Sequence, residues 1–218
     1  MANHSDLISA VHAGDIEKVK ALVQSDASAA SAKDERGVSA LMHAYYRGRR
    51  DIAEIILNSR SNLDIFEATA SGRAQTVSEI LHRDSAQATA WSSDGFTALH
   101  FASFFNEPTI ARELVRRGAD VAAVSMNPME VTPLHSAAAA HATEIVRMLV
   151  ESDAPVNAKQ HGGWTALHAA ADNGNEEMIK ILLQHGADSL AQNDDGKTPA
   201  QIAQLKGREK AFQLLSAA

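Results

Sequence analysis

Thr132-Pro133-Leu134-His135 lies near the middle of the chain, and related stretches recur at nearly regular intervals on both sides of it. The clear copies are residues 95–100, 130–135, 163–168 and 196–201, with a looser fifth copy at 37–42. Their threonines, Thr97, Thr132, Thr165 and Thr198, are 35, 33 and 33 positions apart. A period of this length is typical of a solenoid, in which each unit buries its apolar face by packing on its neighbours.

Each copy predicts the start of a short helix. A Thr or Ser at the N-cap can accept a hydrogen bond from an amide of the first turn. Pro133 and Pro199 then occupy the first helical position, which suits proline, and Gly48 or Gly174 can end the helix in the left-handed conformation. A second helix follows, with apolar residues at helical spacing, as in residues 145–149. The repeating unit is therefore a helix-turn-helix, and the fold class is all-α.

Composition limits the classes of function. Hydrophobic side chains make up 45% of the 218 residues, which is enough to bury a core unaided. Cysteine is absent, which excludes disulfides, thiolate zinc sites and a cysteine nucleophile. The net charge of −7 is spread along the chain without a long Lys/Arg cluster, so we expect no nucleic-acid partner. No run of about 18 apolar residues occurs, so we expect no membrane span.

Thr-Pro-Leu-His, the Gly-Ala-Asp stretches at 118–120 and 186–188, and the period of 33 resemble the ankyrin-repeat family over essentially the whole chain. The resemblance implies one continuous domain, a solenoid of stacked helix-turn-helix units with short β-hairpin loops. About seven units are expected, including divergent caps: residues 6–33, 34–63, 64–91, 92–123, 124–158, 159–191 and 192–218. Such arrays bind other proteins on a concave face, so we expect a protein-interaction scaffold.

Two units depart from this pattern. In the third unit, Asp64 leads straight into the short helix without a Gly-x-Thr hairpin, so we expect a gap or bend in the concave face. The fifth unit carries two extra residues around Asn127, Pro128, Met129 and Glu130, which lengthen its hairpin tip. This tip is a candidate contact loop.

The resemblance places the hairpin tips and the ends of the short helices on the concave face, and large side chains are frequent there. Aromatic and Arg anchors dominate many binding interfaces, so these positions are candidate contacts. The candidate partner-binding residues are Arg36, Val38, Tyr46, Arg47, Phe96, Phe104, Phe105, Met129, Trp164, Asp172, Asn173 and Lys197. In the alternative interpretation, Phe104 and Phe105 pack under a neighbouring hairpin and Trp164 covers the adjacent turn.

Arginines cluster in the amino-terminal part of the chain. Arg36 is followed by Arg47, Arg49 and Arg50, and together they could form a basic patch for an acidic partner segment. The alternative is a solvated edge of little energetic value.

Ten histidines invite a metal or general-base interpretation. His100, His135 and His168, however, recur at one repeat position, where the resemblance implies hydrogen bonds between units. No catalytic or phosphate-binding motif occurs, so we expect no enzyme activity, no metal and no cofactor. A small-ligand or metal-binding protein that assists an enzyme in trans and a self-associating structural protein remain as alternatives.

The expected location and oligomeric state follow from similar reasoning. Residues 1–10 lack the charged-then-apolar order of a secretory signal, which favours a cytoplasmic location. We expect a monomer whose partner is another protein.

Overall fold

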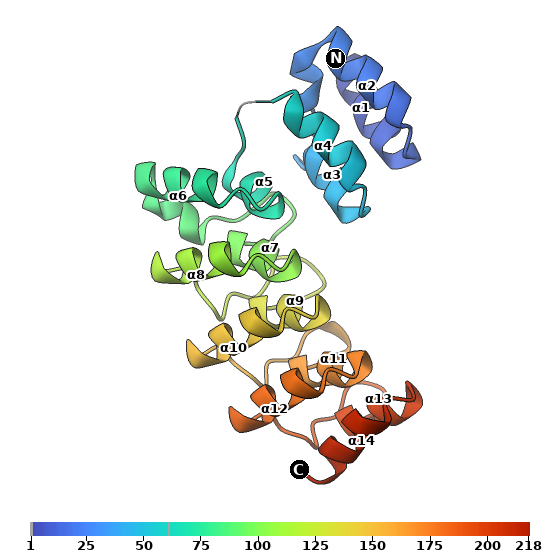
Figure 1. Cartoon of the computed structure of the whole chain (residues 1–218), viewed down its shortest axis with the longest axis vertical. Coiled ribbons are helices and arrows are strands. Elements are labelled where there is room, and N and C mark those ends of the chain that lie inside the picture. The colour runs from blue at the N-terminus through green and yellow to red at the C-terminus, as the bar shows by residue number, and fades with distance from the viewer. Residues whose placement is uncertain (1, 61) are drawn as a thin grey trace.

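The computed structural model describes residues 2–60 and 62–218, and within them the chain forms fourteen α-helices in consecutive pairs (Figure 1). The pairs are α1 (Ala2–Ala13) with α2 (Ile16–Ser25), α3 (Ala40–Tyr46) with α4 (Arg50–Asn58), α5 (Ile65–Ala70) with α6 (Ala74–Arg83), α7 (Ala98–Phe104) with α8 (Pro108–Arg116), α9 (Pro133–Ala139) with α10 (Thr143–Glu151), α11 (Ala166–Asn173) with α12 (Glu176–Gln184), and α13 (Pro199–Leu205) with α14 (Glu209–Ser216). Short 3-10 segments are η1 (Ala27–Ser31), η2 (Ser85–Thr89) and η3 (His161–Gly163). The predicted all-α solenoid is confirmed. In the described residues its hairpin loops contain isolated antiparallel bridges instead of strands, at Lys33–Ser39 and Trp91–Thr97.

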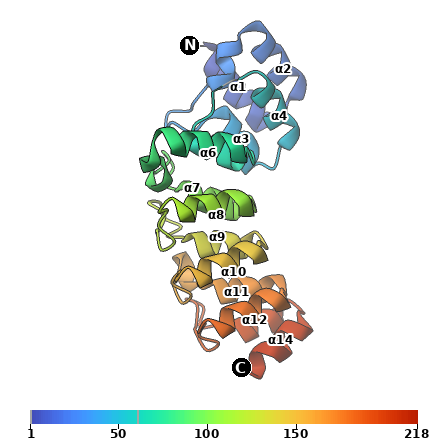
Figure 2. The same ribbon diagram turned by 60° about the vertical axis from the view of Figure 1, so that its left-hand side comes forward.

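The helix pairs stack into a two-layered column. The first helices of successive pairs, α7, α9 and α11, lie side by side in one layer, and the second helices, α8, α10 and α12, form the other (Figures 1 and 2). The loops that precede the first helices lie along the same side of the column. We call the surface formed by these hairpin loops and the first helices the inner face.

Polar side chains fix where the first helices begin. Thr97, Thr132 and Thr165 cap α7, α9 and α11, and each accepts a hydrogen bond from the backbone N–H three residues on. Asp64 caps α5 in the same way. The third helical residue returns a hydrogen bond to the N-cap backbone in all four helices, which satisfies two otherwise unpaired amides.

The buried core is divided near the start of α5. One apolar cluster spans α5 to α14, and a second spans α1 to α4, with Leu63 packed against both. A third, small cluster joins them on the side of the inner face and consists of Val38, Met42, Ala70 and Phe101. In a repeat array each unit is stabilised mainly by its neighbours, so this junction is where coupling along the column is weakest.

Neighbouring hairpin loops are joined by single backbone hydrogen bonds. The N–H of Met126 donates to the carbonyl of Gly95 at 2.8 Å, and the N–H of Asp194 donates to the carbonyl of Gly162 at 3.0 Å. This spacing brings the loop backbones into direct contact. A Cβ built on Gly163 would lie 2.9 Å from the backbone nitrogen of Asp194, closer than real Cβ contacts.

Gly163→Ala is therefore expected to destabilise the fold more than Gly196→Ala. Both glycines have a φ of +72°, so the two variants share a backbone strain of about 1–2 kcal/mol. Gly196 has no neighbouring atom within 4 Å, whereas Gly163 meets backbone. We expect Gly163→Ala to cost about 1–3 kcal/mol more, measured by urea unfolding followed by circular dichroism. Equal losses in the two variants would show that the loops separate freely.

The third unit lacks its hairpin, and α5 follows α4 without one. Units two and four come together across the gap. A Cβ built on Gly37 would lie 3.2 Å from the Cβ of Ser93, and the Tyr46 hydroxyl donates a hydrogen bond to the Asp94 carboxylate. A hollow of about 250 Å³ remains between the two hairpins. The predicted interruption is present, and units that are not neighbours in the repeat order touch directly across it.

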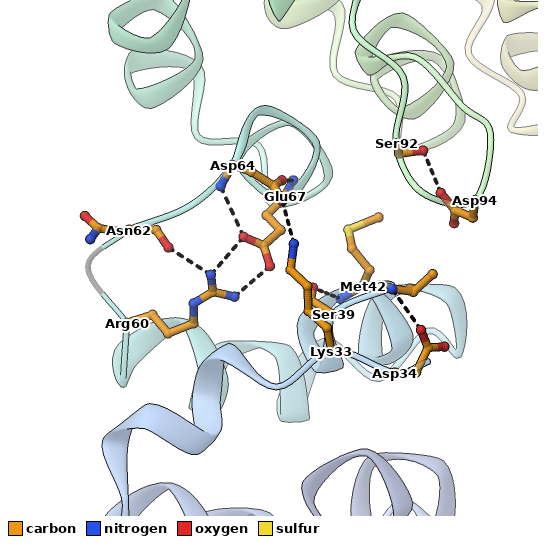
Figure 3. Close-up of polar contacts among 11 residues, drawn as sticks. Lys33, Asp34, Ser39, Met42, Arg60, Asn62, Asp64, Glu67, Ser92 and Asp94 are labelled. Carbon is orange, nitrogen blue, oxygen red and sulfur yellow. Dashed lines mark hydrogen bonds and ion pairs between the residues drawn. The ribbon is translucent and has the colours of Figure 1, made fainter. Parts of the chain in front are cut away.

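A buried ion pair joins the second unit to the third. The Arg60 guanidinium donates to both carboxylate oxygens of Glu67, at 2.6 and 3.0 Å, and to the carbonyl of Asn62 at 2.9 Å (Figure 3). The Arg60 and Glu67 side chains are only 10% and 2% exposed. Glu67 also accepts a hydrogen bond from the backbone N–H of Asp64, which completes the cap of α5. The weakest junction of the column thus contains a charged pair shielded from water.

Candidate functional site

A hollow of about 350 Å³ opens on the inner face where units two, four and five meet. Its aromatic and aliphatic lining includes Tyr46, Phe96, Phe101, Phe104 and Met129. The end of α3, the 92–97 hairpin, α7 and the long hairpin of the fifth unit supply these residues. Four of these five residues were predicted from the sequence, and Phe101 was not. The structure brings all five into one concave feature, which we call the aromatic hollow.

Three large apolar side chains of the aromatic hollow are exposed. Tyr46 is 41% exposed, Phe104 is 51% exposed and Met129 is 55% exposed. Large apolar side chains grouped at an open concave surface are typical of sites that bury a ligand or a partner side chain. For Phe104, the alternative interpretation of packing under a hairpin is wrong.

Phe101 forms the floor of the aromatic hollow and is only 3% exposed. Its ring centroid lies 5.7 Å from that of Phe96, 5.9 Å from that of Phe66 and 6.4 Å from that of Tyr46. The pairs with Phe96 and Phe66 are edge-to-face and the pair with Tyr46 is stacked, and such aromatic pairs add to the stabilisation from burial alone. Sequence reasoning missed Phe101 because it took the candidate contacts from the hairpin tips and the ends of the short helices, whereas Phe101 lies in the middle of α7. The signal was a bulky residue where the next two units have Ser136 and Ala169.

Asp94 lies at the rim of the aromatic hollow and holds two hydroxyl groups. The Tyr46 hydroxyl donates to one carboxylate oxygen. The Ser92 hydroxyl donates to the other at 2.6 Å (Figure 3). Burial, together with the hydrogen bond to Asp94, raises the pKa of Tyr46, so its hydroxyl remains a proton donor at neutral pH. These bonds fix Tyr46 of the second unit against the hairpin of the fourth.

The long hairpin of the fifth unit positions Met129. The Asn127 side chain donates to the carbonyl of Asp94 at 3.0 Å and accepts a hydrogen bond from the N–H of Met129, also at 3.0 Å. Glu130 takes a positive φ of 51°, which turns the chain back toward α9. The inserted residues therefore place Met129 at the hollow, and contact of this tip with a partner stays a prediction.

The three repeated histidines join the start of each first helix to a carbonyl of a later loop. The Thr97 N–H donates to His100 Nδ1 at 3.2 Å, so Nδ1 carries no proton and Nε2–H donates to the carbonyl of Val131 at 3.0 Å. His135 and His168 repeat this arrangement. The Nε2 of His135 lies 2.9 Å from the carbonyl of Ala158 at the end of its own unit, and that of His168 lies 3.0 Å from the carbonyl of Lys197 in the following unit. Burial lowers the pKa of His100 to about 4 and also lowers the pKa values of the other two. The implied hydrogen bonds between units are confirmed for His100 and His168, and His135 bonds to the last residue of its own unit. Both ring nitrogens are used in all three histidines, which leaves neither for a ligand role.

Three candidate contacts pack instead of facing solvent. Val38 is 7% exposed and belongs to the small cluster with Met42, so its expected exposure is wrong. Phe105 is half-buried, with its ring 5.5 Å from that of Tyr45. Trp164 is half-buried, 5.6 Å from the ring of His168 in its own unit. Most of the Phe105 and Trp164 side chains is packed, as in the alternative interpretation. Phe105 covers apolar surface at the end of α7, and Trp164 covers apolar surface just before α11.

The carboxyl-terminal candidates lie outside the aromatic hollow. Asp172 pairs with Lys206 at 2.9 Å, and the Asn173 side chain donates to the carbonyl of Ala138 at 3.0 Å. Both are half-buried and link neighbouring units. Lys197 is half-buried, and its carbonyl accepts the histidine hydrogen bond from the preceding unit.

The arginines of the amino-terminal part have different surroundings in the structure. Arg49 donates to the carbonyl of Gly14 at 3.2 Å and pairs with Asp51 at 2.8 Å, so it serves packing between the first two units. Arg36 and Arg47 are exposed, and within the described part of the chain neither guanidinium forms an ion pair. They lie outside the aromatic hollow, on the side of the second unit.

The stacked helix pairs and capped hairpin units define a helical repeat protein. A family model described as ankyrin repeats (3 copies) matches residues 65–160 and 155–218, so the chain belongs to the ankyrin-repeat family. The chain is 29% identical over 157 residues to the ankyrin repeat domain-containing protein SAT10 of Stachybotrys chartarum. The match covers 70% of this chain and 8% of that relative, so the chain spans a small part of that protein's length. Among the described residues, no helix is long and apolar enough to cross a membrane.

Proposed function

We propose that this chain is a protein-interaction module that binds a partner protein on its inner face, with the aromatic hollow at the centre. Ankyrin repeats are generally protein-interaction modules. The observation that carries the proposal is the group of exposed Tyr46, Phe104 and Met129 around one concavity, in a chain with only 5% aromatic residues. A partner side chain that entered the hollow would remove this surface from water, worth about 25 cal/mol per Å² of apolar area.

The proposal includes a monomer in the cytoplasm and no catalytic step. Light scattering at increasing protein concentration tests the oligomeric state. A rise in molar mass with protein concentration would contradict the monomer and support a self-associating protein.

Phe104→Ser combined with Met129→Ser is expected to abolish partner binding while the fold is retained. Both side chains are more than half exposed, so their loss should change the free energy of unfolding by less than about 1 kcal/mol. Anchor residues of this kind contribute about 2 kcal/mol or more each to binding. Affinity capture from lysate of the source cells, with quantitative mass spectrometry, compares the variant with the unaltered chain.

Leu190→Ser combined with Leu205→Ser is the matched control. These leucines are 77% and 65% exposed and lie outside the aromatic hollow, so they test for non-specific loss of apolar surface. Partners lost by both variants would reflect non-specific adhesion. Partners retained by the Phe104/Met129 variant would place the binding site elsewhere, and the exposed Arg36 and Arg47 would then be the next candidates.

A further inference from the structure

The aromatic hollow contains one carboxylate and no cation. Among its lining residues, Asp94 is the acid, and no lysine or arginine is present. The two groups that Asp94 holds, the hydroxyls of Tyr46 and Ser92, are both neutral. Each carboxylate oxygen accepts one hydrogen bond from them and has capacity for another. The negative charge at the rim therefore lacks a compensating positive charge within the hollow.

The walls of the hollow suit a cation on an apolar stem. Tyr46, Phe96 and Phe104 present aromatic rings to the hollow, with Phe101 beneath them. A cation over an aromatic face is attracted by the ring quadrupole, and the attraction grows as water is excluded. Met129 adds a flexible apolar side chain that adapts to a long aliphatic stem.

Besides Asp94 with its bonded tyrosine, and besides His100 and His135, whose ring nitrogens are already bonded, the lining has two other polar side chains, which can accept a hydrogen bond and have no partner in the described chain. The hydroxyl of Ser136 and the side-chain amide of Gln160 both line the hollow, and neither forms a hydrogen bond within the described residues. Together with Asp94 they surround the apolar floor with three separate acceptors. A guanidinium has five N–H donors in a planar fork and stacks on aromatic rings, whereas an ammonium has three donors around one point.

We propose that the aromatic hollow receives an arginine side chain from a segment of the partner protein. The guanidinium would hydrogen-bond to Asp94, with Gln160 and Ser136 as further acceptors, and its stem would lie between Phe104 and Met129. The net charge of −7 on the whole chain favours the approach of such a basic segment. This inference rests on the proposed function and names the chemistry that the same site recognises.

Selection from a phage-displayed library of random peptides, with the purified chain as bait, tests the inference. We expect the enriched peptides to share an arginine and to be lost with Asp94→Asn, in which the Tyr46 hydroxyl keeps an acceptor. A synthetic peptide from the selection is then compared with its citrulline counterpart, which has the same shape without the charge. We expect about tenfold weaker binding or more for the citrulline peptide by fluorescence polarisation.

Combining the citrulline peptide with the Asp94→Asn variant tests whether the arginine and Asp94 contact each other. If the arginine lies against Asp94, the citrulline peptide should bind the unaltered chain and the Asp94→Asn variant with nearly equal affinity. Enriched peptides without a basic residue, or an arginine peptide that binds Asp94→Asn undiminished, would overturn the arginine assignment. In either case, loss of those peptides with Phe104→Ser and Met129→Ser would leave the proposed function intact. Peptides that this variant retains, or a selection that enriches none, would count against the site itself.

Discussion

Arg60→Ala is expected to lower the free energy of unfolding by about 3–5 kcal/mol, because it leaves the buried carboxylate of Glu67 without its cation. Glu67 has a 2% exposed side chain and would keep only the backbone N–H of Asp64 as a donor. The loss falls at the boundary between the two main core clusters, where few other contacts couple the units. Urea unfolding followed by circular dichroism measures it, and we expect the helices α1 to α4 to unfold first.

Two further variants separate the charge effect from general loss of packing. Arg112→Ala removes a pair with Glu144 of nearly the same length, 2.9 Å, whose side chains are 56% and 61% exposed, and should cost less than about 1 kcal/mol. Adding Glu67→Gln to Arg60→Ala removes the unpaired charge and keeps an acceptor for the cap of α5, as Gln201 does for α13. The double variant should therefore be more stable than Arg60→Ala alone. Equal losses for Arg60→Ala and Arg112→Ala would show that water reaches the junction.

The repeat period predicted most of the fold because each unit repeats the same local chemistry. The N-cap threonines, the histidines three residues later and the missing third hairpin could all be read from aligned copies. One correlation could also have been read: Met42 takes the place of the histidine in the unit before the gap. No hairpin follows to offer a carbonyl, so an apolar side chain occupies that position and packs with Phe101.

The parts that could not be predicted depend on contacts between units that are not neighbours in the repeat order. The period specifies how each unit meets the next and contains no information on how the second meets the fourth. Tyr46 was predicted as an exposed contact, but its bond to Asp94 and the burial of Val38 follow from closure across the gap. The ion pair of Arg60 with Glu67 was missed for the same reason, since it lies where the repeat is broken.

Acidification from pH 7.5 to 4.5 is expected to destabilise the chain through its buried histidines. The pKa of His100 is about 4 in the folded chain and near 6.5 when unfolded, so the unfolded state binds more protons between these values. The contribution of neutral His100 to the free energy of unfolding is therefore fully present above pH 6.5, and it is lost as the pH drops toward 4. His100 alone should account for about 2–3 kcal/mol by pH 4.5. His135 and His168, whose pKa values are also lowered by burial, add losses of the same sign.

His100→Gln isolates this contribution. At pH 7.5 the variant should be less stable by about 1–2 kcal/mol, because the hydrogen bond from Nε2 to the carbonyl of Val131 is lost while the cap acceptor is kept. At pH 4.5 the difference should vanish or change sign, since glutamine takes up no proton in the unfolded state. Urea unfolding at the two pH values measures both numbers, with the exposed His161→Gln as a control that should change stability by less than about 0.5 kcal/mol. If His100→Gln cost the same at both pH values, His100 would bind its proton equally in the folded and unfolded chains. Burial would then not keep the ring neutral at pH 4.5.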